Sequence, residues 1–255
     1  MKVILTLLTP LLLAVPCRGA EGSKALRVVS WNLHHGEGSD GKQDLARIAA
    51  VIQSQEPDVV VLQEVDNKCK RSGGVDQAAE LARLTNLQYV FGKAMDHDGG
   101  EYGQAILSRF PLSDLKIHKL PGEGEPRIAI SARTETPFGP LTVAGVHLDY
   151  GDPARQLVQA QVASAALLEV STGPIVLAGD FNATAESKTL AVFSQAPWIV
   201  VPKSGSAATE PAVKPDKEID FTVVKGLRPV KPTVVVAETA ASDHRPIVTA
   251  FAKPE

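Results

Sequence analysis

The chain alternates short, wholly apolar runs with stretches in which apolar residues recur every three or four positions. Residues 26–31 and 58–62 are apolar runs that predict buried strands, and residues 43–55 between them have the spacing of an amphipathic helix. Residues 75–85 repeat that helical spacing. The chain is therefore expected to begin with a strand, a helix, a second strand and a second helix.

A series of strands separated by turn residues follows. Proline and glycine mark the turns, as in Pro121-Gly122 and in residues 137–140. The predicted strands cover residues 105–107, 115–119, 127–134, 141–146, 175–178, 218–224, 233–236 and 247–251. Residues 153–170 predict a long helix with Asp152 as its N-cap, and residues 186–193 predict a short one.

This many apolar strands can be buried only if both faces of each β-sheet are covered. A single open sheet would leave part of this apolar surface in water, whereas two sheets packed face to face, each covered outside by helices, bury it. The predicted fold class is therefore α/β (α+β): a four-layer αββα sandwich of two mixed β-sheets. Residues 202–215 are rich in Pro, Ser, Gly and Ala, and we expect this segment to be mobile.

The first twenty residues have a different pattern. Lys2 precedes an apolar run that is shorter than the roughly 20 residues needed to span a bilayer, and Gly19 and Ala20 offer a cleavage site. We expect residues 1–20 to be a signal peptide and residues 21–255 to be a single domain without a transmembrane segment. The protein would then be exported, to the periplasm or the extracellular space.

The two cysteines bear on anchoring and on stability. Cys17 leaves lipoprotein anchoring open, but Pro16 stands where a lipobox normally has a small residue, so this alternative is less favoured. Cleavage after the leader would remove Cys17 and leave Cys69 without an intramolecular disulfide partner. The stability of the mature domain must then come from packing.

Composition and charge restrict the partners. Hydrophobic residues make up 44% of the chain and charged residues 22%, which is ordinary for a globular protein. The formal net charge of −3 becomes more negative if Lys2 and Arg18 leave with the leader. Proteins that hold long duplex DNA usually present a basic face, so a nucleic-acid partner stays open but is not favoured. We expect a monomer.

Polar residues recur just beyond the ends of the apolar strands, where many α/β proteins bind ligands. These residues are Asn32, Glu64, His147, Asp149, Asp180, Asn182, Asp220, Asp243 and His244. Each has a structural explanation when taken alone: a cap, a turn or a surface ion pair. Their recurrence at six strand ends is harder to explain in that way, and it predicts one shared site.

Seven motifs in a fixed order carry a resemblance to a known family. They are Ser-Trp-Asn-Leu (30–33), Leu-Gln-Glu-Val (62–65), Tyr-Gly-Gln-Ala-Ile-Leu-Ser-Arg (102–109), Val-His-Leu-Asp (146–149), Gly-Asp-Phe-Asn (179–182), Ile-Asp-Phe (219–221) and Ser-Asp-His-Arg-Pro (242–246). The chain resembles a secreted, bacterial-type member of the endonuclease/exonuclease/phosphatase (deoxyribonuclease I-like) superfamily. That resemblance implies the αββα fold and hydrolysis of a phosphate ester.

The resemblance also implies a metal site. Glu64 would be the main ligand, helped by Asn32, and Asp243 would lie near the metal. Oxygen ligands without a cluster of Cys or His suit a hard cation, so Mg²⁺ is the expected cofactor, with Mn²⁺ or Ca²⁺ as substitutes.

The catalytic roles implied by the resemblance divide among five residues. His244 would act as general base for the attacking water, with Asp220 fixing its ring. Asp180 would position the water. Asn182 and His147 would hold the oxygens of the scissile phosphate, and His147 could also protonate the leaving oxygen.

Four further residues are candidates for substrate binding. Arg71 lies in a Gly-rich loop and its planar guanidinium suits phosphate, although an exposed loop arginine explains it equally well. Tyr102 opens the motif of residues 102–109, and Asp149 closes the motif of residues 146–149. Gln104 stands where many relatives have Asn after Tyr-Gly, which makes a phosphate contact there less secure.

Three functions stay open at this point. The favoured one is a metal-dependent phosphodiesterase or phosphomonoesterase acting on a small molecule or a lipid head group. A secreted nuclease is the alternative, disfavoured by the acidic charge and the 5% aromatic content. A catalytically inactive binding module is a minor alternative, since all the motif residues are present.

Overall fold

The structure is a computed structural model that describes residues 25–252. The predicted signal peptide and Cys17 therefore lie outside the described residues. The first sheet has eight strands in the order β10-β13-β14-β1-β2-β4-β3, with β12 also paired to β14. Its strands are β1 (Leu26–Asn32), β2 (Val59–Asn67), β3 (Gln88–His97), β4 (Gly100–Ser108), β10 (Lys203–Ser204), β12 (Arg228–Pro229), β13 (Thr233–Val235) and β14 (Ile247–Ala252).

The second sheet has six strands in the order β5-β6-β7-β8-β11-β9. Its strands are β5 (Leu112–Leu120), β6 (Arg127–Thr136), β7 (Gly139–His147), β8 (Ile175–Asp180), β9 (Ile199–Val200) and β11 (Asp220–Lys225). The first sheet contains two parallel pairs, β1 with β2 and β10 with β13, and the second contains one, β7 with β8, among antiparallel neighbours. Both sheets are therefore mixed, as predicted.

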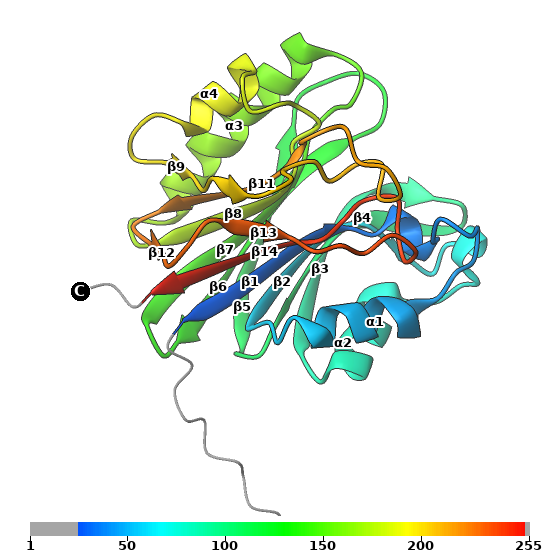
Figure 1. The fold of residues 1–255 in the computed structure, drawn as a ribbon. Helices are drawn as coiled ribbons and strands as arrows, with labels where there is room; N and C mark the ends of the chain where they lie inside the picture. Colours follow the sequence, from blue (N-terminus) through cyan, green and yellow to red (C-terminus); the bar gives the residue numbers. More distant parts are fainter. Residues whose placement is uncertain (1–24, 253–255) are drawn as a thin grey trace, which may run out of the picture.

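Helices cover the outer face of each sheet. Figure 1 shows α1 and α2 beside the first sheet and α3 and α4 beside the second. The helices are α1 (Leu45–Ser54), α2 (Gln77–Thr85), α3 (Pro153–Val170) and α4 (Lys188–Phe193), and two 3-10 turns, η1 (His34–Gly36) and η2 (Lys70–Ser72), follow β1 and β2. Within the described residues no helix is long and apolar enough to cross a membrane.

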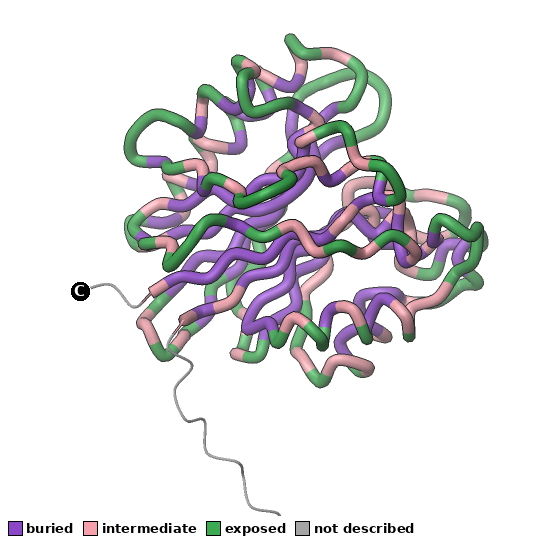
Figure 2. Tube along the Cα trace, in the orientation of Figure 1, coloured by how far each residue is buried: buried purple, intermediate pink, exposed green. Residues whose placement is uncertain are grey.

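Three apolar clusters correspond to the three interfaces of a four-layer sandwich. Val28 packs in the cluster between the sheets, whereas its neighbour Val29 packs in the cluster that holds α1 and α2. Adjacent strand residues point to opposite faces, so a continuous apolar run fills two layers at once. The third cluster joins α3 and α4 to the second sheet. The central strands, such as β1, β2 and β8, are buried along almost their whole length (Figure 2), and the predicted αββα architecture is confirmed.

Side-chain caps set the starts of the helices. Asp44, Asp76 and Ser187 each accept a backbone N–H of the first turn, so these helices begin one or two residues later than the periodicity predicted. Asp152 accepts the backbone N–H groups of Ala154 and Arg155, and this confirms it as the N-cap of α3.

The main element missed by the sequence pattern is β3. Its residues are mostly half-exposed, without the strict alternation that predicts a strand, because β3 lies at the edge of the first sheet. It is held by a long antiparallel pairing with β4, which itself begins at Gly100 rather than at residue 105. The pairing with β4, rather than a hydrophobic period of its own, therefore determines this strand.

The segment 202–215, which we expected to be mobile, contains β10 and is attached to the loop that carries His244. The backbone N–H of Arg245 donates to Thr209, and the Arg245 side chain donates to the carbonyl oxygen of Ala212. The mobility of residues 202–215 stays a prediction. Cys69 is a buried thiol that donates to the carbonyl oxygens of His97 and Glu101.

Candidate active site

The ends of β1, β2, β7 and β8 bring the motif residues together at one edge of the sandwich. Because β7 and β8 are parallel, their last residues, His147 and Asp180, are register partners. Asp220 begins β11 and pairs with Asp180 from the other side. Asn32, at the end of β1 in the facing sheet, reaches across to Asp180. The shared site predicted from strand ends is thus formed by both sheets.

Asn32 links the two sheets at this site. Its Nδ2 donates to Glu64 Oε1 at 2.9 Å and to Asp180 Oδ2 at 3.1 Å. Its Oδ1 accepts the backbone N–H of His34 at 3.0 Å, which fixes the orientation of the amide. Here the Asn32 amide positions two carboxylates, and its predicted role as a metal ligand stays a prediction.

Glu64 occupies an irregular position in β2. The pairing of β2 with β4 shifts register between Leu62 and Val65, and Glu64 at this bulge has a φ of +54°. A left-handed conformation is uncommon for a residue other than Gly, Asn or Asp, and bulges of this kind re-aim a side chain. The Glu64 side chain is 22% exposed. Burial, followed by the charge of Asp243, raises its pKa, although the Asn32 hydrogen bond opposes this shift.

Asp220 and His244 form a buried pair. His244 Nδ1 donates to Asp220 Oδ2 at 3.0 Å, and His244 Nε2 lies 3.8 Å from Asp180 Oδ2. The indole of Trp31 donates to the backbone oxygen of His244 and holds its loop against β1. Burial lowers the pKa of His244, but the charge and hydrogen bond of Asp220 outweigh this and raise it to about 10. The orientation is the one the sequence predicted.

Asp180 and Asn182 form a tight turn after β8. Asp180 Oδ1 accepts the backbone N–H of Asn182, which has a left-handed φ of +49°. The Asn182 side chain donates to the carbonyl oxygen of Leu148, which fixes it beside the loop after β7. Burial, and then the charge of Asp220, raise the pKa of Asp180 to about 7. Negative charge is therefore concentrated here beyond what the neighbouring cations neutralise.

His147 has a partner that the sequence analysis missed. Arg127 Nη1 lies 2.9 Å from His147 Nδ1, and Arg127 is only 6% exposed. A guanidinium can only donate, so Nδ1 accepts and the proton of the neutral ring resides on Nε2. That Nε2 lies 3.6 Å from Asp180 Oδ2 and 4.0 Å from Glu64 Oε1. Burial and the Arg127 charge lower the pKa of His147, consistent with a neutral ring that donates through Nε2.

The position of Arg127 in the chain explains why it was missed. It opens β6, whereas the strand-end pattern selects residues that close a strand. Only the antiparallel register of β6 and β7, in which Ala129 faces Val146, places it beside His147. Arg127 precedes the apolar run Ile128-Ala129-Ile130, and a charged residue at the start of a buried run was the signal available in the sequence.

We expect Arg127→Met to lower kcat about 10- to 100-fold, because the His147 ring could then adopt either tautomer. The KM should change less. Nitrogen NMR of the His147 ring should show an unprotonated Nδ1 in the wild type and a mixture in the variant. Arg133→Met is the matched control, since Arg133 lies on the same strand, has a side chain that is 59% exposed and donates to Val170. Equal losses in both variants would contradict the role of Arg127.

The four predicted substrate-binding residues lie in different settings. Arg71 donates through Nε and Nη2 to both oxygens of Asp66, and its guanidinium lies 5.4 Å from the ring centre of Tyr102. Tyr102 is buried, and this burial raises its pKa. Gln104 is buried and donates to the backbone of Ile128 in the facing sheet.

Asp149 serves the turn that leads into α3. Its Oδ1 accepts the backbone N–H groups of Gly151 and Asp152, and its Oδ2 lies 3.3 Å from Arg155 Nε. These contacts give Asp149 a structural function. Direct contact of the four residues with a substrate stays a prediction.

The residues present fit a hard divalent cation. Ligand atoms of Asp180, Asp220 and His244 lie within 4.8 Å of one another, and all three residues are buried. Among the described residues Asp220 Oδ1 is buried without a hydrogen-bond partner. Burial is the main cause of the raised pKa values of Glu64 and Asp180, and the charges of Asp243 and Asp220, which a cation would offset, add to it. Carboxylate oxygens are the ligands that hard cations prefer. The Asn32 amide connects this group to the predicted metal ligand Glu64, because it donates to both Asp180 and Glu64.

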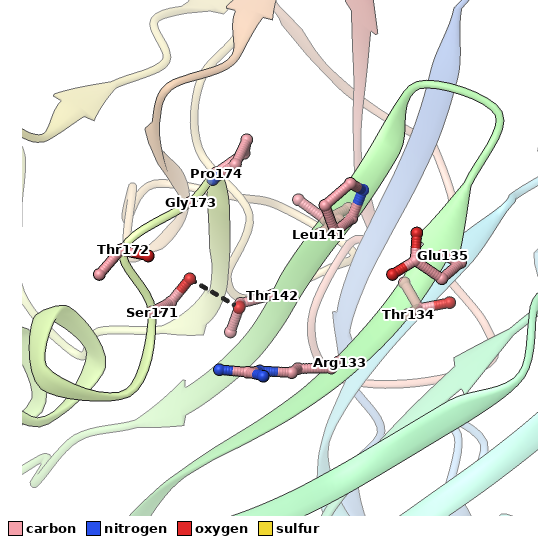
Figure 3. Close-up of a pocket in the computed structure, with 10 residues that line it drawn as sticks. Arg133, Thr134, Glu135, Leu141, Thr142, Ser171, Thr172, Gly173 and Pro174 are labelled. Atoms are coloured by element: carbon pink, nitrogen blue, oxygen red, sulfur yellow. Dashed lines mark hydrogen bonds between the residues drawn. The ribbon is translucent and has the colours of Figure 1, made fainter.

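A surface pocket lies elsewhere on the molecule. It has a volume of about 240 Å³ and is lined by Arg133, Leu141, Thr142, Ser171 and neighbouring residues (Figure 3). Thr142 and Pro174 are at the starting ends of β7 and β8, opposite the ends that carry His147 and Asp180. The pocket in Figure 3 is therefore separate from the candidate active site.

Solved structures with the same fold come from bacteria and from humans. An endonuclease/exonuclease/phosphatase of Beutenbergia cavernae DSM 12333 has a TM-score of 0.73 at 24% identity, covering 91% of this chain and 72% of that one. A mannosyl-6-phosphatase of Bacteroides thetaiotaomicron VPI-5482 has a TM-score of 0.73 at 20% identity, with 89% and 99% covered. The human Nocturnin catalytic domain, solved with a bound sulfate anion, has a TM-score of 0.71 at 20% identity, with 90% and 94% covered.

Sequence comparison gives a more specific result. No curated protein matches the chain by sequence. A sequence profile described as the Endonuclease/Exonuclease/phosphatase family matches residues 29–244, a range that includes every residue of the site described above. Members of this family are hydrolases that act on phosphoesters. The chain belongs to the Endonuclease/Exonuclease/phosphatase family.

Proposed function

We propose that this protein is an exported, Mg²⁺-dependent phosphoesterase that hydrolyses a phosphodiester or phosphomonoester by in-line attack of water. The observation that carries the proposal is the buried Asp220–His244 pair, whose Nε2 faces Asp180. A histidine fixed at one ring nitrogen and directed with the other into an acidic cluster would accept a proton from a water held there once a cation bound among the carboxylates offsets the negative charge that raises its pKa.

Each remaining side chain has a place in this reaction. Glu64 and Asp243, with Asn32 behind them, would hold the cation, which supplies positive charge to the phosphoryl group and the leaving oxygen. His147 would donate its Nε2 proton in a hydrogen bond to a non-bridging phosphate oxygen. Asp180 would orient the attacking water, and Asn182 would contact the phosphate from the turn after β8. Asp220 keeps the His244 ring in the required orientation.

Substrate hydrolysis tests the proposal directly. The mature chain should hydrolyse at least one of p-nitrophenyl phosphate, bis(p-nitrophenyl) phosphate, sphingomyelin, phosphoinositides, sugar phosphates and plasmid DNA with Mg²⁺ present, and EDTA should abolish the activity. Hydrolysis in EDTA would contradict metal dependence. No hydrolysis of any of these with Mg²⁺ or Mn²⁺ would favour an inactive binding module.

A nuclease is the second candidate, and the family of the chain is its main support, since the family includes nucleases by name. The acidic net charge disfavours it, because nonspecific DNA binding depends on neutralising several phosphates with Lys and Arg. Cleavage of plasmid DNA alone would reverse the order of the two candidates.

A further inference from the structure

A second pocket lies next to the candidate active site. It has a volume of about 250 Å³ and is formed by the β5–β6 loop, the β7–α3 loop and the first turn of α3. Its lining residues are Glu123, Gly124, Glu125, Asp149, Tyr150, Gly151 and Arg155. Among these lining residues, Asp149 is the one that belongs to the motifs that define the site. We call this the Tyr150 pocket.

Arg127 connects the Tyr150 pocket to the site. Its guanidinium carbon lies 5.9 Å from the centre of the Tyr150 ring, and its Nη1 lies 2.9 Å from His147 Nδ1. Glu125, in the wall of the pocket, is 3.3 Å from the same Nη1. One guanidinium thus contacts both the pocket and the histidine that faces the acidic cluster. A group attached to a phosphate at His147 would be within reach of this pocket.

The lining offers an aromatic face together with both donors and acceptors. Tyr150 is 75% exposed, the highest value among the exposed large hydrophobic residues of the described chain. An uncovered aromatic ring costs free energy in water, and its negative face attracts the C–H groups of a ligand that packs on it. Within residues 25–252 the exposed Glu123 carboxylate has no ion-pair partner, and Arg155 supplies N–H donors.

The lining disfavours two classes of ligand, a polynucleotide more strongly than a cation, because the carboxylates of Glu123 and Glu125 attract positive charge. The carboxylates of Glu123 and Glu125 would repel the further phosphates of a polynucleotide. A cationic head group would meet the guanidinium groups of Arg127 and Arg155, and it would find one aromatic ring where a cage of several binds such cations well. Hydroxyl groups donate and accept at once, so they match a wall that presents carboxylates and N–H groups side by side.

The size is consistent with a single small group. Ligand pockets for drug-sized molecules have volumes of about 300–1,000 Å³, and the Tyr150 pocket is smaller. Gly124, in the lining, has a φ of +95° with open space around its Cβ position. We propose that the Tyr150 pocket binds the sugar or polyol part of the substrate, which makes hydroxyl-rich phosphate esters the substrate class of this enzyme. This inference rests on the proposed phosphoesterase function.

Competition between substrates tests the inference. The measured quantity is the ratio of kcat/KM for glucose 6-phosphate to kcat/KM for p-nitrophenyl phosphate, with Mg²⁺ present. In Tyr150→Ala this ratio should fall about tenfold, because the sugar loses its stacking face. Tyr89→Ala is the matched control, since Tyr89 is a half-exposed tyrosine on β3 whose register partner is Leu107, at the opposite end of β4 from Tyr102. It should leave the ratio unchanged.

A second variant separates a polyol from a cationic group. Glu123→Gln keeps hydrogen-bonding atoms but removes the charge, so hydrolysis of glucose 6-phosphate should change less than about threefold. If glycerophosphocholine is instead the better substrate and Glu123→Gln impairs its hydrolysis strongly, the pocket binds a cation and the inference is wrong. An unchanged ratio in Tyr150→Ala would also overturn it. Absence of all hydrolysis by the wild type would overturn the proposed function itself, which is a distinguishable result.

Discussion

Replacing His244 with alanine or asparagine is expected to lower kcat about 100- to 10,000-fold, because both variants remove the nitrogen that faces Asp180. The alanine variant also leaves the buried Asp220 carboxylate without its donor, so part of any loss could come from instability. Asparagine can still donate to Asp220 from the position of Nδ1. Steady-state kinetics with Mg²⁺, together with thermal melting of both variants, separates these effects.

The control for His244 is another histidine that contacts no residue of the site. His118, on β5, is half-buried, and its ring forms a hydrogen bond with the hydroxyl of Ser131. His118→Ala should keep kcat within about threefold of the wild type, as for an ordinary substitution away from the site. A folded His244→Asn protein with wild-type turnover would show that His244 is not the base.

Replacing Glu64 with glutamine is expected to have opposite effects on activity and stability. Turnover should fall by orders of magnitude and more Mg²⁺ should be needed for half-maximal rate, because a charged ligand is lost. In EDTA, however, the variant should melt at a higher temperature than the wild type. Burial and Asp243 raise the pKa of Glu64, so its ionised form destabilises the metal-free fold, whereas glutamine keeps the acceptor for Asn32.

The sign of this stability effect gives it a characteristic pH dependence. A carboxyl group whose pKa is raised in the folded state destabilises the fold as the pH rises above its unfolded value, here 4.5. The advantage of Glu64→Gln should therefore vanish below that pH and grow above it. Glu80→Gln, which removes an exposed ion pair with Arg83 on α2, should show no such gain. A Glu64→Gln protein that is less stable than the wild type in EDTA at neutral pH would contradict the argument.

Much of the fold could be predicted from local patterns. The apolar runs at β1, β2 and β8 are buried on both faces, so their continuous hydrophobicity indicated two packed sheets. The start of α3 could be predicted from Asp152, whose side chain caps the first turn. β3 could not be predicted in this way, because its half-exposed residues carry no period and the strand is defined by its antiparallel pairing with β4.

Most of the residues that gather at the site could also be predicted, whereas the hydrogen bonds and distances among them could not. Residues that close strands were identifiable because parallel strands end at a common edge. The amide of Asn32 between Glu64 and Asp180, the bulge that re-aims Glu64, and the closeness of Asp180, Asp220 and His244 all depend on how the two sheets face each other.

The sequence by itself determined the layers of this protein, its family motifs and the set of acidic, amide and histidine side chains available for chemistry. Only the tertiary structure decided how those side chains are used. Arg127 fixes the proton of His147, and Tyr150 opens a pocket beside it, through contacts between strands and loops of the second sheet. Local sequence determines periodicity and capping over a few residues, but hydrogen-bond partners and charge coupling depend on distances across the sandwich that no local pattern contains.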